Sequence, residues 1–372
     1  MAYLGESIKK LGFGLMRLPM IEGNVDIEQT NKMVDMFLER GFTYFDTAYG
    51  YAEGKSEEAV KTCIVNRHPR ERFQLATKLP AWAGPKTAEE AKQMFWTSLE
   101  RTGAGYFDFY LLHNMGATRT KFFDDFGMWD YIKELKEKGL VKHIGFSFHD
   151  RAEHLDELLT KHPEMEFVQL QINYADWESG FVQSRKCCEV AKKHNKPIVI
   201  MEPVKGGMLA EPADSVKAIF DGSDAKASYA SWAIRFAASL DNVITVLSGM
   251  STIEQMEDNT DFMAEFKPLD EAEQKLIVKA QEALAAIPSI PCTGCGYCTP
   301  GCPQSIVIPK IFEAMNKKLV YNNDNAAKFG YMWETKFGGK GSDCVECGSC
   351  ETVCPQQIPI IEHLKEAAKL YE

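Results

Sequence analysis

Two runs of four cysteines near the end of the chain share one spacing, C-x2-C-x2-C-x3-C followed by proline. The first run is Cys292, Cys295, Cys298 and Cys302, and the second is Cys344, Cys347, Cys350 and Cys354. Gaps of two residues let three thiolates on one tight loop converge on three corners of a cube, while the fourth thiolate points away. Glycines inside the loops permit φ > 0 and turn backbone N–H groups toward sulfur. The spacing therefore predicts [4Fe–4S] clusters.

This spacing resembles that of the bacterial ferredoxins that hold two [4Fe–4S] clusters. The resemblance implies that the last cysteine of each run completes the cluster of the other run. One cluster would be held by Cys292, Cys295, Cys298 and Cys354, and the other by Cys344, Cys347, Cys350 and Cys302. Structural zinc also favours C-x2-C pairs, but it is the weaker alternative because both runs carry the fourth cysteine and the proline.

Composition limits the classes of function. The chain has 372 residues, which is more than one ordinary domain needs, and its 45% hydrophobic and 26% charged residues are typical of globular proteins. Lys and Arg number 42 against 53 Asp and Glu, so the net charge is −11, which argues against nucleic acid as a main partner. No apolar run is long enough to predict a membrane span. Oxygen-labile clusters and free thiols lead us to expect a reducing cytoplasm.

Residues 1–285 alternate short apolar runs with longer amphipathic stretches. The apolar runs predict strands buried on both faces, at residues 11–16, 42–46, 73–77, 107–112, 141–147, 167–171, 197–201 and 243–248. Helical patterns, including 27–40, 87–101 and 126–138, fill the gaps. This alternation predicts an α/β fold of the (β/α)8 TIM-barrel type. A doubly wound sheet is the alternative, although no G-x-G-x-x-G follows an early strand. Residues 286–372 are expected to form a smaller, bacterial-ferredoxin-like iron–sulfur domain.

Polar residues stand at the predicted carboxyl ends of the strands, where such barrels do their chemistry. The sequence there resembles the aldo/keto reductase family through Gly-Phe-Gly14, Phe-Asp46-Thr-Ala-x-x-Tyr51, Thr-Lys78 and Leu-Leu-His113. The resemblance implies a catalytic tetrad of Asp46, Tyr51, Lys78 and His113 that reduces the carbonyl of a small molecule. Tyr49 is the competing phenol, but the spacing from Asp46 favours Tyr51. Any one of these residues alone is as well explained as a hydrogen-bonded polar group at the barrel rim.

The chemistry of such a tetrad follows from the residue types. Hydride transfer to a carbonyl places negative charge on oxygen, and a phenol is a weak proton donor at neutral pH. The ammonium of Lys78 is expected to lower the pKa of Tyr51, and Asp46 to keep Lys78 charged. His113 would donate a hydrogen bond to the developing alkoxide.

The resemblance also implies a nicotinamide cofactor. The residues that it assigns to the cofactor are Ser147, Gln169, Lys205, Gly206, Gly207, Glu254 and Asn259. The loop at 205–207 would cradle phosphate through backbone N–H groups. The chain departs from the family at Gly249, Met250 and Gln255, where a Lys-Ser pair and an arginine would hold the 2′-phosphate of NADP. NADP(H) and NAD(H) therefore carry equal weight.

The two parts of the chain predict different electron chemistry. The barrel predicts two-electron hydride transfer, whereas clusters move one electron each. A flavin is the usual converter, and a barrel mouth could hold one although no flavin motif is evident. The leading hypothesis is an oxidoreductase that reduces an aldehyde or ketone and exchanges electrons with ferredoxin or another redox protein. The alternative is an electron-transfer module whose barrel binds a flavin or docks a partner, without carbonyl reductase activity.

Overall fold

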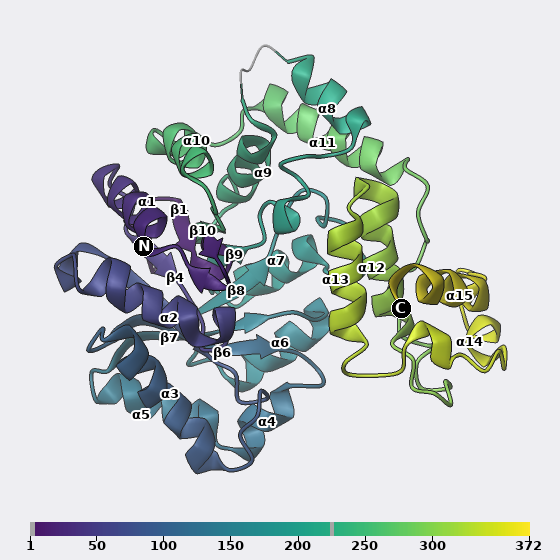
Figure 1. Cartoon of the computed structure of the whole chain (residues 1–372), viewed down its shortest axis with the longest axis horizontal. Coiled ribbons are helices and arrows are strands. Elements are labelled where there is room, and N and C mark those ends of the chain that lie inside the picture. The colour runs from purple at the N-terminus through teal and green to yellow at the C-terminus, as the bar shows by residue number, and fades with distance from the viewer. Residues whose placement is uncertain (1–3, 224–226) are drawn as a thin grey trace. The chain divides into compact units, whose positions relative to one another are not determined.

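A closed barrel of parallel strands forms the body of the computed structural model, which describes residues 4–223 and 227–372 (Figure 1). Hydrogen-bonded neighbours follow the order β1-β10-β9-β8-β7-β6-β5-β4. These strands are β1 Leu11–Gly14, β4 Tyr44–Asp46, β5 Gln74–Leu79, β6 Phe107–Met115, β7 Val141–Phe148, β8 Phe167–Gln171, β9 Ile198–Met201 and β10 Val243–Ser248. A short antiparallel pair, β2 Met20–Ile21 and β3 Asn24–Val25, follows β1. The predicted (β/α)8 barrel is confirmed.

Helices alternate with the strands along the barrel sequence. They are α1 Ile27–Glu39, α2 Lys55–Ala59, α3 Ala88–Thr102, α4 Thr120–Asp125, α5 Met128–Glu137, α6 Ala152–Lys161, α7 Ser184–Lys193, α9 Tyr229–Ala238 and α10 Ile253–Ala264. Short turns of helix, η1 Leu15–Arg17, η2 Tyr51–Gly54 and η5 Lys205–Gly207, follow β1, β4 and β9. These turns are where several of the predicted site residues lie.

Large side chains fill the inside of the barrel. Tyr44, Phe109 and Phe167 are buried, and the ring centroid of Phe109 lies 5.0 Å from Tyr44 and 5.2 Å from Phe167. A second layer of apolar side chains lies between strands and helices, for example Phe37 against Phe45 at 5.2 Å. Strands with apolar contacts on both faces explain the near-continuous apolar runs of the sequence.

Side chains cap the start of two helices, α1 and α3. Asp26 accepts a hydrogen bond from the backbone of Gln29 at 3.0 Å, and Thr87 accepts one from Glu90 at 3.2 Å. Each satisfies an N–H group that the first turn of a helix leaves unpaired. Glycine 41, with φ of 79°, follows the end of α1 in the left-handed conformation that ends helices.

The helix predicted over residues 126–138 is confirmed as α5, which starts two residues later than predicted. A short helix, α4, precedes it, and Gly127 between the two takes φ of 66° and ψ of 33°. A left-handed residue cannot continue a right-handed helix, so the chain turns there and α5 starts at Met128. Both helices bury aromatic side chains, Phe123 on α4 and Trp129 on α5.

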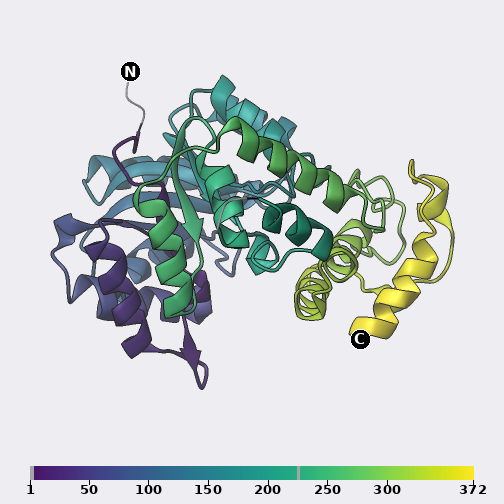
Figure 2. The same ribbon diagram turned by 90° about the horizontal axis from the view of Figure 1, so that it is seen from above.

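The chain divides into two compact units. The barrel unit comprises Met1–Trp177, Val182–Gly206 and Ala230–Asp270, and the second unit comprises Glu178–Phe181, Gly207–Tyr229 and Glu271–Glu372. Helices of the second unit are α8 Asp214–Asp221, α11 Glu271–Ala285, α12 Ile308–Tyr321, α13 Asp324–Glu334, α14 Ser349–Thr352 and α15 Ile360–Tyr371. The pair α12 and α13 occupies the stretch between the two cysteine runs, and α15 ends at the C-terminus (Figure 2).

A separate apolar core holds the second unit together. It includes Ile311 and Phe312 of α12, Tyr331 of α13 and Leu364 of α15, with buried cysteines at its edge. None of the helices in the described part of the chain joins the length and the apolar character that crossing a membrane requires.

Glycine 145 on β7 should be indispensable to the barrel. An added Cβ would lie 2.4 Å from the carbonyl oxygen of Phe167 on the paired strand, which cannot move without breaking the barrel register. We expect Gly145→Ala to lower the free energy of unfolding by at least about 2 kcal/mol, at the upper end of overpacking effects. Gly50→Ala is the matched control, because nothing lies within 4 Å of its added Cβ and its φ is −98°. Equal denaturation midpoints for the two variants would contradict this account.

Candidate active site and thiol-lined cavities

A buried ammonium joins three of the four predicted catalytic residues. Lys78 on β5 donates hydrogen bonds to Asp46 Oδ1 at 2.6 Å, to the carbonyl of Thr47 at 2.7 Å and to Tyr51 Oη at 3.3 Å. In the strand register Asp46 lies opposite Ala76, two residues before Lys78, so both side chains rise from the same face of adjacent strands. Lys78 is 1% exposed and Asp46 2%. All three ammonium protons therefore have partners in a water-poor site.

The turn η2 presents Tyr51 to this ammonium. The Tyr51 backbone N–H donates to the carbonyl of Ala48 at 3.1 Å, and Ala52 and Glu53 then take φ of 49° and 59°. Lys78 Nζ lies 4.7 Å from the centroid of the Tyr51 ring. Left-handed backbone at two non-glycine residues costs free energy, so other contacts must stabilise this turn.

Buried polar side chains after Tyr51 supply those contacts. Ser56 donates to the carbonyl of Leu15 at 2.9 Å and lies 2.7 Å from the hydroxyl of Thr47. Glu57 is fully buried, accepts a hydrogen bond from Thr77 at 2.7 Å and lies 3.4 Å from Arg101. Ser56 and Glu57 thus hold the loop that contains Tyr51 against the ends of β1 and β4 and against β5.

The fourth residue, His113 on β6, faces the same place. Its ring centroid lies 5.9 Å from that of Tyr51 with the planes at 79°, an edge-on contact. Trp82 packs beside it at 6.3 Å and donates through its indole N–H to the His113 carbonyl at 2.8 Å. Burial, and then the positive charge of Lys78, lowers the pKa of His113 well below its ordinary value. The imidazole is therefore neutral at physiological pH.

The direction expected for the pKa of Tyr51 is wrong. Lys78 does pull this pKa down, but burial of the phenol is the larger effect and the pKa of Tyr51 is raised. Burial also opposes the charge on Lys78, yet Asp46 and Tyr51 outweigh it and raise the pKa of the ammonium. Sequence spacing indicated the neighbouring charge but not the depth of the site. Tyr51 consequently keeps its proton, as a proton donor must.

Two of the residues assigned to the nicotinamide lie side by side on neighbouring strands. Ser147 on β7 is paired in register with Gln169 on β8, and both are buried. The Ser147 hydroxyl accepts a hydrogen bond from the backbone of Asn114 at 2.7 Å. Gln169 Oε1 is buried without a hydrogen-bond partner among the described residues. An amide group with unused hydrogen-bonding capacity fits the carboxamide of a nicotinamide.

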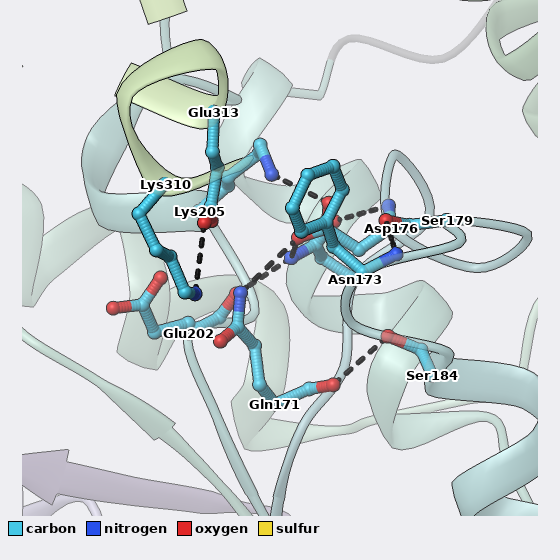
Figure 3. Close-up of polar contacts among 10 residues, drawn as sticks. Gln171, Asn173, Asp176, Ser179, Ser184, Glu202, Lys205, Lys310 and Glu313 are labelled. Atoms are coloured by element: carbon cyan, nitrogen blue, oxygen red, sulfur yellow. Dashed lines mark hydrogen bonds and ion pairs between the residues drawn. The ribbon is translucent and has the colours of Figure 1, made fainter. Parts of the chain in front are cut away.

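Lys205 is committed to a partner within the barrel unit. Its ammonium lies 2.5 Å from Asp176 Oδ1, and Asp176 also accepts hydrogen bonds from Asn173 at 2.8 Å and Gln171 at 3.3 Å (Figure 3). The Asn173 amide donates in addition to the carbonyl of Glu202 at 3.2 Å. The residues of this loop would therefore contact a phosphate through backbone N–H groups and not through the Lys205 ammonium, and Gly206 takes φ of 65° there.

The two residues that the resemblance assigns on α10, Glu254 and Asn259, have different environments. Asn259 is buried and donates to the Ser248 hydroxyl at 2.6 Å, whereas Glu254 is exposed in the first turn. Gln255 accepts from the Ser251 backbone at 2.7 Å, so it braces the start of the helix.

Three further residues near the predicted site, Asp176, Trp82 and Arg17, were not assigned a role from the sequence. The position of Arg17 directly after the first predicted strand was the signal that could have indicated it.

Each predicted set of four cluster cysteines lines one cavity in the second unit. The first cavity is lined by Cys292, Cys295, Cys298 and Cys354. The second is lined by Cys302, Cys344, Cys347 and Cys350. Ile308 belongs to the walls of both cavities. The structure therefore brings the last cysteine of each run to the other run.

The thiols of a cavity disfavour one another's ionisation. Burial raises the pKa of Cys292 to about 11, the backbone N–H of Gly294 opposes this rise, and the neighbouring cysteines, Cys354 among them, add to it. Bound iron reverses this balance because a metal takes the thiolate form. In the described residues no three Cys, His, Asp or Glu side chains are placed to hold a single metal ion. Four thiols around an apolar cavity suit a multi-atom cluster.

Family models match most of the chain. Residues 10–282 match the aldo/keto reductase family, and residues 291–358 match the 4Fe-4S dicluster domain. The chain belongs to the aldo/keto reductase family. It is an oxidoreductase of that family with a C-terminal 4Fe-4S dicluster domain, and both predicted resemblances are confirmed.

Individual relatives share the barrel. An aldo-keto reductase of Mycolicibacterium vanbaalenii is 30% identical over 243 residues, 64% of this chain and 79% of that protein. Another, of Mycolicibacterium smegmatis, is 31% identical over 156 residues, and the chain spans only 51% of its length. A solved aldo-keto reductase from Bacillus halodurans has a TM-score of 0.61 at 24% identity, covering 76% of this chain and 96% of that one. One from Klebsiella pneumoniae in complex with NADPH has a TM-score of 0.57 at 20% identity, covering 73% and 90%. These solved structures share the fold.

The buried ion pair between Lys78 and Asp46 should be costly to break from one side. Lys78→Met leaves the buried carboxylate of Asp46 without its cation, and we expect a loss of about 3–5 kcal/mol in unfolding free energy. Asp46→Asn combined with Lys78→Met should recover part of this loss, because no buried charge then remains.

Denaturant titration at neutral pH measures both effects. Lys32→Met is the matched control, since its partner Glu28 lies 2.8 Å away on an exposed helix face, where such pairs contribute about 0.5 kcal/mol or less. If Lys78→Met were no more destabilising than Lys32→Met, the pair would not be a structural element of the barrel.

Proposed function

We propose that the protein reduces the carbonyl of a small aldehyde or ketone with NAD(P)H, and that it also carries two [4Fe–4S] clusters for electron transfer. The observation that supports the first part is the contact of one ammonium, Lys78, with both the Asp46 carboxylate and the Tyr51 phenol. Such an arrangement prepares a proton donor for an oxygen that gains negative charge.

Each side chain has a separate task in this proposal. Bound NAD(P)H supplies hydride to the carbonyl carbon. Tyr51 donates its proton to the carbonyl oxygen, and Lys78 stabilises the phenolate that remains. Asp46 holds the ammonium charged and in place. The neutral imidazole of His113 donates a hydrogen bond to the same oxygen and does not compete for its proton.

The cofactor site of the proposal combines buried polar groups with glycine-containing loops. Gln169 and Ser147 would bind the nicotinamide carboxamide, since Gln169 Oε1 is buried without a partner in the described residues. The turn at Lys205 and Gly206 would approach the pyrophosphate through its backbone. We keep both NADP(H) and NAD(H), and a flavin is a further candidate for linking hydride to single electrons.

The thiol-lined cavities support the proposal of two clusters. Ile308 belongs to the walls of both, which suits transfer of electrons from one cluster to the other. Cys347, a ligand of the proposed second cluster, is exposed, so that cluster is the one open to an external redox protein such as a ferredoxin. Oxygen-labile clusters of this kind fit a reducing cytoplasm.

The raised pKa of Tyr51 makes a prediction about pH. The active form is the protonated phenol, so activity is retained below its pKa and lost as pH rises through it. We expect the kcat of carbonyl reduction to stay level between about pH 6 and 9 and to fall only above about pH 10. No inflection should occur near 6.5, because the pKa of His113 is held well below that value.

Variants of two neighbouring tyrosines identify the donor. Tyr51→Phe should lower kcat at least about 100-fold, the lower range for loss of a general acid. Tyr49→Phe should change kcat less than about threefold. The Tyr49 ring packs 4.6 Å from Arg101, and in the described residues its phenol makes no hydrogen bond to the Lys78 ammonium. Reduction that proceeds unchanged in Tyr51→Phe would remove this phenol from the mechanism.

Iron analysis tests the clusters and their crossed ligands. Protein purified without air should contain about eight iron and eight sulfide per chain, as two [4Fe–4S] clusters require. Cys354→Ala should halve both by emptying the cavity lined by Cys292, whereas Cys63→Ala, which removes a buried barrel thiol, should change neither. Analysis of bound organic cofactors in the same preparation would reveal a flavin. Colourless, zinc-containing protein would contradict the cluster proposal.

A further inference from the structure

Arg17 lies at the carboxyl end of the barrel and has a guanidinium without a counterion among the described residues. It ends the turn η1 after β1, and its side chain is exposed. Within residues 4–223 and 227–372, its guanidinium has neither an ion-pair nor a hydrogen-bond partner. Lys78 and Lys205, by contrast, are neutralised by Asp46 and Asp176. Because the chain has a net charge of −11, an arginine without a counterion among the described residues is unusual at this place.

Two glycines on the neighbouring loops make room for this side chain. A Cβ added at Gly249, directly after β10, would lie 3.3 Å from Arg17 Cδ, and one added at Gly206, after β9, would lie 3.2 Å from Arg17 Nη2. The arm of Arg17 thus crosses the end of β10 and brings its guanidinium to the loop after β9. Backbone N–H groups of a glycine loop and a guanidinium meet there, which is a donor set that suits a phosphate.

The backbone of Arg17 is held in place. The Ser251 hydroxyl donates to the Arg17 carbonyl at 2.6 Å, and Ser56 donates to the carbonyl of Leu15 at 2.9 Å. The first contact ties η1 to the loop after β10, and the second ties it to the segment that follows Tyr51. An anchored arginine loses less entropy on binding than one on a loose loop.

Other candidate cations near the cofactor are absent or occupied. Met250 is buried, and the Gln255 side chain accepts a hydrogen bond from the Ser251 backbone. The Lys205 ammonium is paired with Asp176. The chain therefore lacks a basic residue where the family would supply one after β10, and Arg17 reaches the same loop from β1.

We propose that Arg17 binds a phosphate group of the dinucleotide cofactor. This inference rests on the proposed nicotinamide chemistry and adds the residue that neutralises the cofactor's charge. The phosphate is either the pyrophosphate, which NADH and NADPH share, or the 2′-phosphate, which only NADPH carries. The guanidinium suits both, because its fork matches two phosphate oxygens at once.

Calorimetric titration of the full-length protein with four probes tests the proposal. The probes are NADH, NADPH, ADP-ribose and 2′-phospho-ADP-ribose, of which the last two contain the phosphates without nicotinamide. We expect Arg17→Gln to raise Kd about 10- to 100-fold, the effect of losing hydrogen bonds to a charged group. Arg17→Lys should recover part of the affinity. Arg185→Gln, which removes one exposed arginine of α7, is the charge-matched control and should leave Kd within about twofold.

The pattern of loss identifies the phosphate. Weaker binding of all four probes assigns Arg17 to the pyrophosphate, and weaker binding of only the two 2′-phosphorylated probes assigns it to the 2′-phosphate. Unchanged affinity in Arg17→Gln, or no binding of any probe by the unaltered protein, overturns the inference.

A carbonyl reductase assay separates the inference from the proposed function. Arg17-dependent binding of ADP-ribose without carbonyl reduction would overturn the reductase proposal and leave the phosphate site standing. Reduction that is insensitive to Arg17→Gln at limiting cofactor would do the opposite.

Discussion

The candidate active site of this barrel depends on one buried charge, the ammonium of Lys78. An ammonium removed from water is tolerated only when its protons have acceptors and its charge has a counterion, and Lys78 finds both in Asp46, Thr47 and Tyr51. Closure of the barrel makes this arrangement possible, because it brings the ends of β4 and β5 into fixed register. The strained turn after Tyr51 holds the phenol beside this ammonium, and the buried Glu57 braces that turn. Burial also explains why the phenol keeps its proton although a cation lies beside it.

In the second unit, cysteine thiols are the groups whose charge needs a partner. Burial and the neighbouring cysteines raise the pKa of Cys292, so its thiolate is unfavourable until a metal compensates for the charge. Apolar residues such as Ile308, Phe312 and Leu364 line the two cavities and keep water away. The proposed function therefore places two sites of different character within one chain. One would serve a hydride and a proton, and the other single electrons.

Which cations are already neutralised decides what each loop is able to bind. Lys205 stands in the glycine-containing loop that the family resemblance assigns to phosphate, yet its ammonium belongs to Asp176. Arg17 was not assigned to any site from the sequence, yet its guanidinium lies beside Gly206 and Gly249 without a counterion in the described part of the chain. A positive residue near a phosphate site is informative only when its partners are known. Those partners come from segments far apart in the chain.

The sequence by itself determined the eight-stranded alternation and the bounds of β8 and β10, because these follow from local periodicity. It also determined the cysteine spacing, since three ligands of each proposed cluster lie on one short loop. Only the tertiary structure decided the raised pKa of Tyr51, the pairing of Lys205 and the lack of a counterion for Arg17 among the described residues. Each of these depends on burial or on contacts between distant segments, and none leaves a periodic signal in the chain. The predicted tetrad lies between the two cases. Family motifs indicated its residues, and the tertiary structure brought Asp46, Tyr51 and Lys78 within hydrogen-bonding distance, with the His113 ring edge-on to Tyr51.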